Sequence, residues 1–434
     1  MNLANKFRSF AILAKPNQTQ ISRPSRNSFH RVIFPILFVT QCFGLFPVQG
    51  ISGSHTYHLR FKWLSFRTFF SFVTALIGCL MAFLEVQRLE RQKVSAKNVS
   101  GVLFMLIAIM IAIIFIFVAK KWRLIMMFWE KNENIFLKAP YKQTNKLRRK
   151  ISMSAMTMLL LAGVEHALAK ASAVYGYEAE AVHCNDTVIN RFRYYATREY
   201  HHVFTRYGYH PAVAIAFWTF SVFLTYAWSF VDFFIIMISM GIAERFSQIN
   251  ELMNETYQKS SSKLGAPDFW RMIRSHFNSA CEILEHVDDN ISSIIILSCL
   301  SNLYFICLQV LNITVKLPYM INSIYFWFSL FFLIFRTCAV FLSAAEINEQ
   351  AEGPLEIIRH LPNSVWNVDI ERLADQIRTQ TIALSGMKFF FMTRRLLFGM
   401  IGTIITYEIV MMQNDQSSKS PYKIDCSLVY DIEA

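Results

Sequence analysis

The chain has 434 residues, of which 54% are hydrophobic and 15% aromatic, and its formal net charge is +13. A soluble domain has about 45–50% apolar residues, so the composition excludes an ordinary soluble protein and indicates a membrane protein. The basic residues collect in loops between long apolar runs, where they set membrane topology and meet anionic inner-leaflet lipid, so we expect no nucleic-acid partner.

A membrane-spanning helix needs about 20 apolar residues, and the sequence predicts seven such helices. The predicted spans are residues 64–86, 99–119, 151–171, 212–240, 291–312, 319–343 and 388–412. An earlier apolar stretch, 31–51, contains Pro35, Gln41 and Pro47, which interrupt a helix. We therefore expect this stretch to lie on the membrane surface or against the bundle rather than to cross.

The distribution of Lys and Arg predicts the orientation. Residues 1–62 hold eight basic residues and no acidic one, and residues 120–150 hold ten basic residues against two acidic ones. Cytoplasmic loops carry the excess of Lys and Arg, so both segments are expected in the cytoplasm. Seven spans then place the C-terminus outside the cell, which is the reverse of a G-protein-coupled receptor.

The whole chain is predicted to be one all-α membrane domain with five parts. These are a cytoplasmic N-terminal segment (1–63), a six-helix bundle (64–343) with a cytoplasmic extension (243–290), a cytoplasmic anchor helix (344–387), a last membrane helix (388–413) and an extracellular tail (414–434). In the anchor segment an apolar stripe recurs at helical spacing: Trp366, Ile370, Leu373, Ile377 and Leu384. The stripe either packs on its own chain or forms a platform shared between subunits, and we expect it at a subunit interface.

Two covalent features are expected on the outer side. Asn185 lies in a glycosylation sequence within the outer loop 172–211. Cys184 and Cys426 should both face the oxidising outside, and the sequence leaves open whether they form a disulfide or remain two thiols.

Polar and aromatic side chains gather at one depth of the predicted bundle, below its outer surface. Such residues are informative because each polar group costs free energy to bury in a membrane. The first candidates for ligand contact are Glu165, His166, Trp228 and Trp327. The secondary candidates are Glu85, Trp218, Tyr226, Gln309, Asn322 and Tyr325.

Two interpretations of this set are open. The residues form either an aromatic belt with helix–helix hydrogen bonds, or an outward-facing pocket for a sugar. A sugar suits the second, since carboxylates and amides bind hydroxyl groups while aromatic rings stack on C–H patches. Asp232 and Arg336 fall deeper in their spans and are expected to be structural partners. The sequence has no Ser/His/Asp grouping, phosphate loop or metal-ligand spacing, so we expect neither an enzyme nor a cofactor.

The last span carries an unusual polar stripe. Thr406, Ile409 and Gln413 share one helical face, and Met412 is their neighbour. In a single bundle this face is a dry helix–helix seam. In a symmetric oligomer it lines a central pore, with Gln413 as a polar ring and Ile409 or Met412 as a constriction that gates by dewetting.

At this point the sequence resembles a known family. The run "TYEIVMMQ" (406–413) is similar to the C-terminal signature of insect gustatory receptors, although Asn414 stands where that signature usually has Phe. The Glu after Tyr, and the stretches "QCFGLFPVQGI", "GVEHAL", "SMGIAERFSQIN" and "YFWFSLFFLIFRTCAV", resemble the sugar-sensing branch.

The resemblance implies an inverted seven-helix subunit, a tetramer and a ligand-gated cation channel with a central pore lined by the last helix. The expected function is then a sugar-gated, poorly selective cation channel in the plasma membrane of gustatory neurons. Its expected partners are a small sugar, cations, the lipid bilayer, and further copies of itself or other gustatory receptor subunits. The alternatives are a G-protein-coupled chemoreceptor, which needs the opposite orientation, and a solute carrier, for which no inverted repeat is detectable.

Overall fold

The structure of the protein is a computed structural model that describes residues 27–91, 96–184, 190–201, 203–204, 208–259, 264–314 and 317–414. In this part of the chain the regular elements are helices, and β-structure is limited to two isolated bridges. The main helices are α2 (Phe29–Cys42), α3 (Phe66–Arg91), α4 (Ala96–Glu133), α5 (Lys146–His183), α6 (Arg191–Glu199), α8 (Pro211–Lys259), α10 (Pro267–Leu311), α11 (Met320–Arg359), α12 (Val368–Thr379) and α13 (Arg394–Asn414). Three 3-10 turns connect them: η1 (Thr56–His58), η2 (Asn312–Thr314) and η3 (Asn363–Val365).

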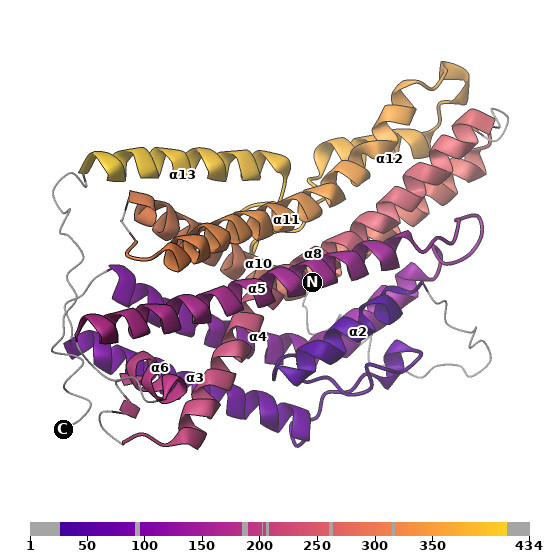
Figure 1. The fold of residues 1–434 in the computed structure, drawn as a ribbon. Coiled ribbons are helices and arrows are strands. Elements are labelled where there is room, and N and C mark those ends of the chain that lie inside the picture. The colour runs from indigo at the N-terminus through magenta and orange to yellow at the C-terminus, as the bar shows by residue number, and fades with distance from the viewer. Residues whose placement is uncertain are drawn as a thin grey trace.

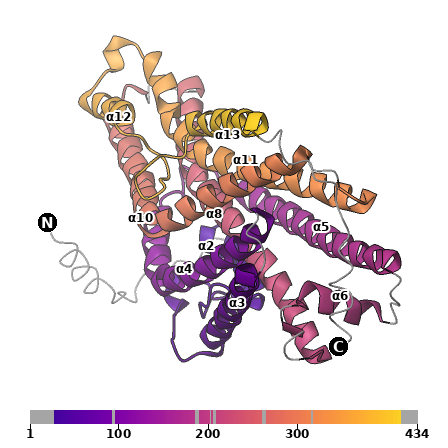
Figure 2. The same ribbon diagram turned by 90° about the vertical axis from the view of Figure 1, so that its left-hand side faces the viewer.

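Six of the described helices are long and apolar enough to cross a membrane: α3, α4, α5, α8, α10 and α11. They correspond to the first six predicted spans, which confirms a helical, multi-pass membrane protein. α8 is the central helix of the bundle, with α4, α5, α10 and α11 packed against it (Figure 1). α6 and α12 lie at opposite ends of the bundle in both views (Figure 2).

α8, α10 and α11 continue beyond their predicted spans at the end of the bundle that carries α12. The apolar residues keep helical spacing there, and Ile249, Met253 and Phe277 are fully buried. Polar residues on the outer faces pair across helices, as Lys146 does with Glu251 at 2.7 Å. The membrane bundle is therefore continuous with a helical extension that shares its apolar core.

α12 buries its apolar stripe within its own chain. Ile370, Leu373 and Ile377 are at most 5% exposed, and α12 packs on α10 and α11. The expectation that these side chains lie at a subunit interface is therefore wrong, because the chain itself already covers them. Trp366 precedes α12 and is 46% exposed, whereas Leu384 follows it in a buried, non-helical segment.

Replacing Leu373 with Asp is expected to destabilise the subunit by about 3–5 kcal/mol, because an unpaired charge would be buried. The thermal midpoint of the purified protein in detergent measures this effect. Val368→Asp on the same helix is the matched control, since Val368 is 59% exposed and should tolerate the charge. If the two variants are equally stable and only Leu373→Asp changes the number of subunits in the assembly, the stripe of α12 lies at a subunit interface after all.

The stretch 31–51 packs against the bundle, which is one of the two positions expected for it. Its helix α2 has 14 residues, about 21 Å, which is too short to cross about 30 Å of hydrocarbon. Glu133 of α4 accepts from the backbone N–H of Phe29 at 3.0 and 3.2 Å and pairs with Arg245 of α8 at 2.9 Å. Pro35 lies inside this helix and does not end it.

α13 begins at Arg394, six residues later than the predicted span at 388. The preceding residues form a tight reversal in which Ser385 bridges to Phe391. α13 packs on α10 and α11 at its start, where Leu397 is buried. Further along, Ile405 is 55% exposed. Figure 1 shows this helix at the edge of the bundle, next to α11.

Candidate functional site

A chain of hydrogen bonds joins three helices in the half of the bundle nearer α6. The Ser329 hydroxyl of α11 donates to Glu165 of α5 at 2.6 Å. The Gln309 amide of α10 donates to the same hydroxyl oxygen at 3.1 Å. We call these three residues the Glu165 chain. Glu165 and Gln309 were expected to share a site, and the structure brings them together through a buried serine that sequence reasoning missed.

A positional signal could have identified Ser329. It follows Asn322 by seven residues and Tyr325 by four, so all three lie on one face of α11. Both of those residues were candidates for ligand contact. A small hydroxyl in the same row is the natural bridge between them and a carboxylate on a facing helix.

His166, next to Glu165 on α5, contacts Thr225 of α8, with its Nδ1 at 3.1 Å from the hydroxyl oxygen. The Thr225 hydroxyl donates its single hydrogen to the carbonyl of Ser221 at 3.0 Å. His166 Nδ1 must therefore donate, which leaves Nε2 of a neutral imidazole as an acceptor. This Nε2 atom is buried and has no hydrogen-bond partner among the described residues.

Two further acceptors, one in the Glu165 chain and one earlier on α11, are buried and unpaired within the described part of the protein. They are the side-chain oxygens of Gln309 and Asn322. Buried polar atoms in proteins almost always have partners, so an orphan requires an explanation.

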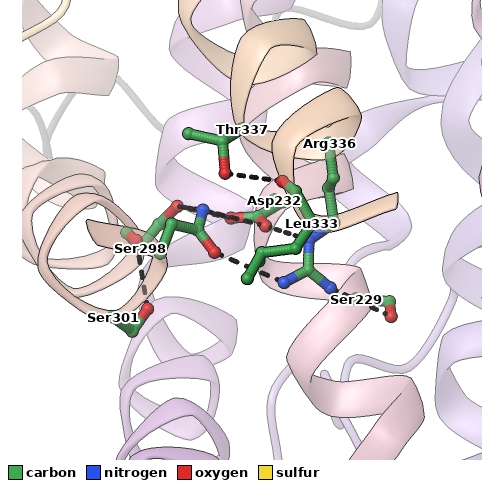
Figure 3. Close-up of polar contacts among 8 residues, drawn as sticks. Ser229, Asp232, Ser298, Ser301, Leu333, Arg336 and Thr337 are labelled. Carbon is green, nitrogen blue, oxygen red and sulfur yellow. Dashed lines mark hydrogen bonds and ion pairs between the residues drawn. The ribbon is translucent and has the colours of Figure 1, made fainter. Parts of the chain in front are cut away.

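A second polar group, the Asp232–Arg336 cluster, joins α8, α10 and α11 (Figure 3). Arg336 of α11 and Asp232 of α8 are almost fully buried and form an ion pair at 2.6 Å. Asn302 of α10 donates to both Asp232 oxygens at 3.1 Å and accepts from Arg336 at 3.3 Å. Ser298 also donates to Asp232, and Arg336 donates to Ser229 at 3.4 Å.

The cluster confirms that Asp232 and Arg336 are structural partners. It also accounts for Trp228, because the Arg336 guanidinium lies 5.2 Å from the centroid of its ring. Arg336 interacts electrostatically with Glu165 as well. α11 therefore carries both polar groups, with Ser329 and Arg336 about two helical turns apart.

Four residues that were predicted to contact a ligand have neighbours other than the Glu165 chain or are exposed. Tyr226 points to α2, where its hydroxyl lies 3.0 Å from Thr40. Glu85 lies beside Gly101 of α4. Trp218 and Trp327 are 42% and 44% exposed. The structure therefore does not gather these four around the Glu165 chain, and their role as ligand contacts stays a prediction.

α6 covers the ends of α5 and α8 nearest to the Glu165 chain. Lys170 of α5 donates to the Tyr195 hydroxyl at 3.0 Å and lies 3.8 Å from Glu199. Tyr177 donates to Glu199 at 2.8 Å. Cys184, at the end of α5, is disulfide-bonded. Its predicted partner Cys426 and the predicted glycosylation site Asn185 lie outside the described residues.

The polar face of the last helix is exposed in the single chain. Thr406 is exposed, its hydroxyl donates to the carbonyl of Gly402 at 2.9 Å, and Ile409 is 54% exposed. Met412 and Gln413 belong to α13, but their side chains lie outside the described part. Among the described residues, no group of three or more His, Cys, Asp or Glu side chains could hold a metal ion.

Comparisons with known proteins point to one family. The family described as "Trehalose receptor" matches residues 15–426 of the chain. The gustatory receptor for sugar taste 64a of Drosophila melanogaster is 37% identical over 415 residues, which cover 94% of this chain and 89% of the relative. The gustatory receptor 5a for trehalose of the same species is 30% identical and covers 92% of this chain and 88% of its own length.

The fold also has a solved counterpart. The insect olfactory receptor OR5 from Machilis hrabei, in complex with eugenol, is similar to this chain with a TM-score of 0.64. The match covers 89% of this chain and 99% of the receptor, at 15% sequence identity. At that identity the likeness concerns the arrangement of helices alone.

Proposed function

Because the chain belongs to the trehalose receptor family of insect sugar gustatory receptors, we propose that it is a sugar-gated, poorly selective cation channel. α13 is then the seventh membrane helix, the α6 end faces the outside, and the α12 end faces the cytoplasm. The functional unit is a homotetramer, or an assembly with other gustatory receptor subunits, in the plasma membrane of gustatory neurons. The protein has no enzymatic activity and needs no cofactor.

The structural observation that carries the proposal is the Glu165 chain, in which polar side chains of α5, α10 and α11 meet inside the bundle, with unpaired acceptors on the same three helices. Gln309 Oε1, His166 Nε2 and Asn322 Oδ1 come from three different helices and are all buried. A sugar presents a rim of hydroxyl donors, which matches several acceptors at once. The Glu165 carboxylate, already oriented by Ser329, is the strongest acceptor of the group because it is ionisable.

The relation to sugar-taste and trehalose receptors supports the ligand class. Thr406 and Ile409 of α13 lack a cover within their own chain, so lipid, a neighbouring subunit or a water-filled axis must cover this face. We favour the water-filled axis, because the sequence places a glutamine at 413 in the same stripe, and an amide is costly to bury in lipid.

Glu165→Gln is expected to raise the sugar concentration for half-maximal current by about 10- to 100-fold, the effect of one lost charge-assisted hydrogen bond. Glutamine keeps the shape and can still accept from Ser329. Whole-cell current against a panel of mono- and disaccharides, trehalose included, measures the shift. Glu371→Gln is the control and should leave the midpoint in place, because Glu371 is exposed on α12, at the other end of the bundle. An unchanged midpoint for Glu165→Gln, at normal surface density, would refute this binding site.

A further inference from the structure

The segment between α12 and α13 is a strained reversal with buried ends and an exposed tip. Gly386 N–H donates to the carbonyl of Phe390 at 3.0 Å, and Met392 N–H donates to that of Leu384 at 2.8 Å. Leu384 and Met392 are fully buried. At the tip, Met387 and Lys388 have φ values of 51° and 64°, which non-glycine residues rarely adopt. Such backbone persists only where neighbouring contacts enforce it.

Asp288 of α10 supplies those contacts. Its carboxylate is almost fully buried and accepts from the Ser385 N–H at 2.6 Å, the Ser385 hydroxyl at 2.7 Å and the Lys388 ammonium at 2.5 Å. The Ser385 hydroxyl oxygen in turn accepts from the Lys388 N–H at 3.2 Å. We call Asp288, Ser385 and Lys388 the Asp288 clasp. It fixes both ends of the strained tip to one helix.

The clasp stands at the base of α13. A second link is formed by Arg394, the first residue of α13, whose guanidinium donates to Glu349 of α11 at 2.6 Å. Beyond this base the helix has little cover, as Phe398 at 70% and Ile405 at 55% exposure show. Within the subunit, α13 is therefore attached to α10 and α11 at its base and has little cover beyond it.

The same two helices that hold the base of α13 also carry the Glu165 chain. Asp288 and Gln309 are both on α10, about 32 Å apart along one continuous helix. Glu349 and Ser329 are both on α11. A shift of either helix at the Glu165 chain would thus move an attachment point of α13. Rigid elements of this kind can carry energetic coupling between distant sites.

We propose that the Asp288 clasp is the mechanical coupling between the ligand-binding bundle and the last helix, with Asp288 as a positioning residue for gating. The expected effect on current rests on the proposed function, whereas the hydrogen bonds of the clasp do not depend on it. When sugar shifts α10 and α11, the clasp forces the base of α13 to follow. Without it, the bundle would still bind sugar while the last helix no longer responded.

The test uses the full-length protein with Asp288→Asn, and Asp289→Asn as the matched control. Asp289 is the next residue, is 67% exposed, and lies 3.7 Å from the same ammonium. Hydrogen exchange of the purified protein should become about tenfold faster at residues 385–393 in Asp288→Asn and stay unchanged in Asp289→Asn. Unchanged exchange in both variants would overturn the clasp. If Asp288→Asn fails to fold, Lys388→Gln replaces it, because Lys388 is 58% exposed and less critical for folding.

Current recordings then test the coupling. At equal surface density, Asp288→Asn should lower the ratio of maximal sugar current to basal current at least about threefold. Sugar should still slow the hydrogen exchange of the backbone amides around Glu165, Gln309 and Ser329 in this variant, because binding is retained. A variant with fast exchange at 385–393 but an unchanged maximal current would overturn the coupling. A wild-type protein that gives no sugar current would instead refute the proposed function, and the exchange result would still decide on the clasp.

Discussion

Replacing Arg336 with methionine is expected to remove most of the folded protein from the cell surface. Asp232 would remain buried without its counter-ion, and removing one partner of a buried pair costs about 3–5 kcal/mol. That is a large share of the roughly 5–15 kcal/mol by which folded proteins are stable. Arg336 also contacts the rings of Trp228 and Phe332, so its loss weakens packing as well.

The double variant Arg336→Met with Asp232→Asn separates charge from packing. Neutral replacements of a buried ion pair are often tolerated, so the double variant should recover most of the surface expression and thermal midpoint lost by Arg336→Met alone. Arg359→Met provides the matched control, because Arg359 is an exposed arginine at the end of the same helix. If Arg336→Met behaves like Arg359→Met, the cluster does not hold α8 and α11 together.

The positions of the six bundle helices could be predicted because the bilayer sets their length and composition. The continuation of α8 beyond 240 was also predicted, as the extension 243–290, and α8 runs to Lys259 with Ile249 and Met253 buried. The start of the last helix could not be predicted: the apolar run begins near 388, but the chain reverses there and α13 begins only at Arg394. Pro35 likewise does not break α2, because the helix rests on α4, α5 and α8.

The sequence could predict that Glu165 and Gln309 share one level of the bundle, where the structure brings them together, but not the direction of each side chain around its helix. Ser329 and Trp327 lie at one depth on α11, yet two residues turn the side chain by about 200°. The serine is therefore buried against Glu165, while the tryptophan is 44% exposed. The same limit applies to Leu373. Its periodicity predicts burial, but the sequence does not say that the cover comes from the same chain.

For the last helix, the corresponding question is which of its side chains face the proposed pore. In a single chain Ile409 and Val410 are about equally exposed, at 54% and 50%. Exposure in one subunit therefore cannot tell a pore-facing residue from one that faces lipid or a neighbouring subunit. Around a fourfold axis the two side chains differ by about 100°, so only one of them can face the centre. Thr406 shares the face of Ile409, and so does position 413.

Cysteine placed at 406 or 409 is expected to react with a charged thiol reagent at least about tenfold faster when sugar opens the channel, and the reaction should change the current. The reason is that a constriction closed by dewetting excludes a charged reagent until the helices separate and water enters. Cysteine at 410 should react at a rate that sugar does not alter. The wild-type protein measures the background reaction of the native cysteines with the reagent, since Cys42 and Cys79 are exposed. Equal, sugar-independent reactivity at all three positions would show a dry seam or a lipid-facing helix, and the pore would have to be sought elsewhere in the assembly.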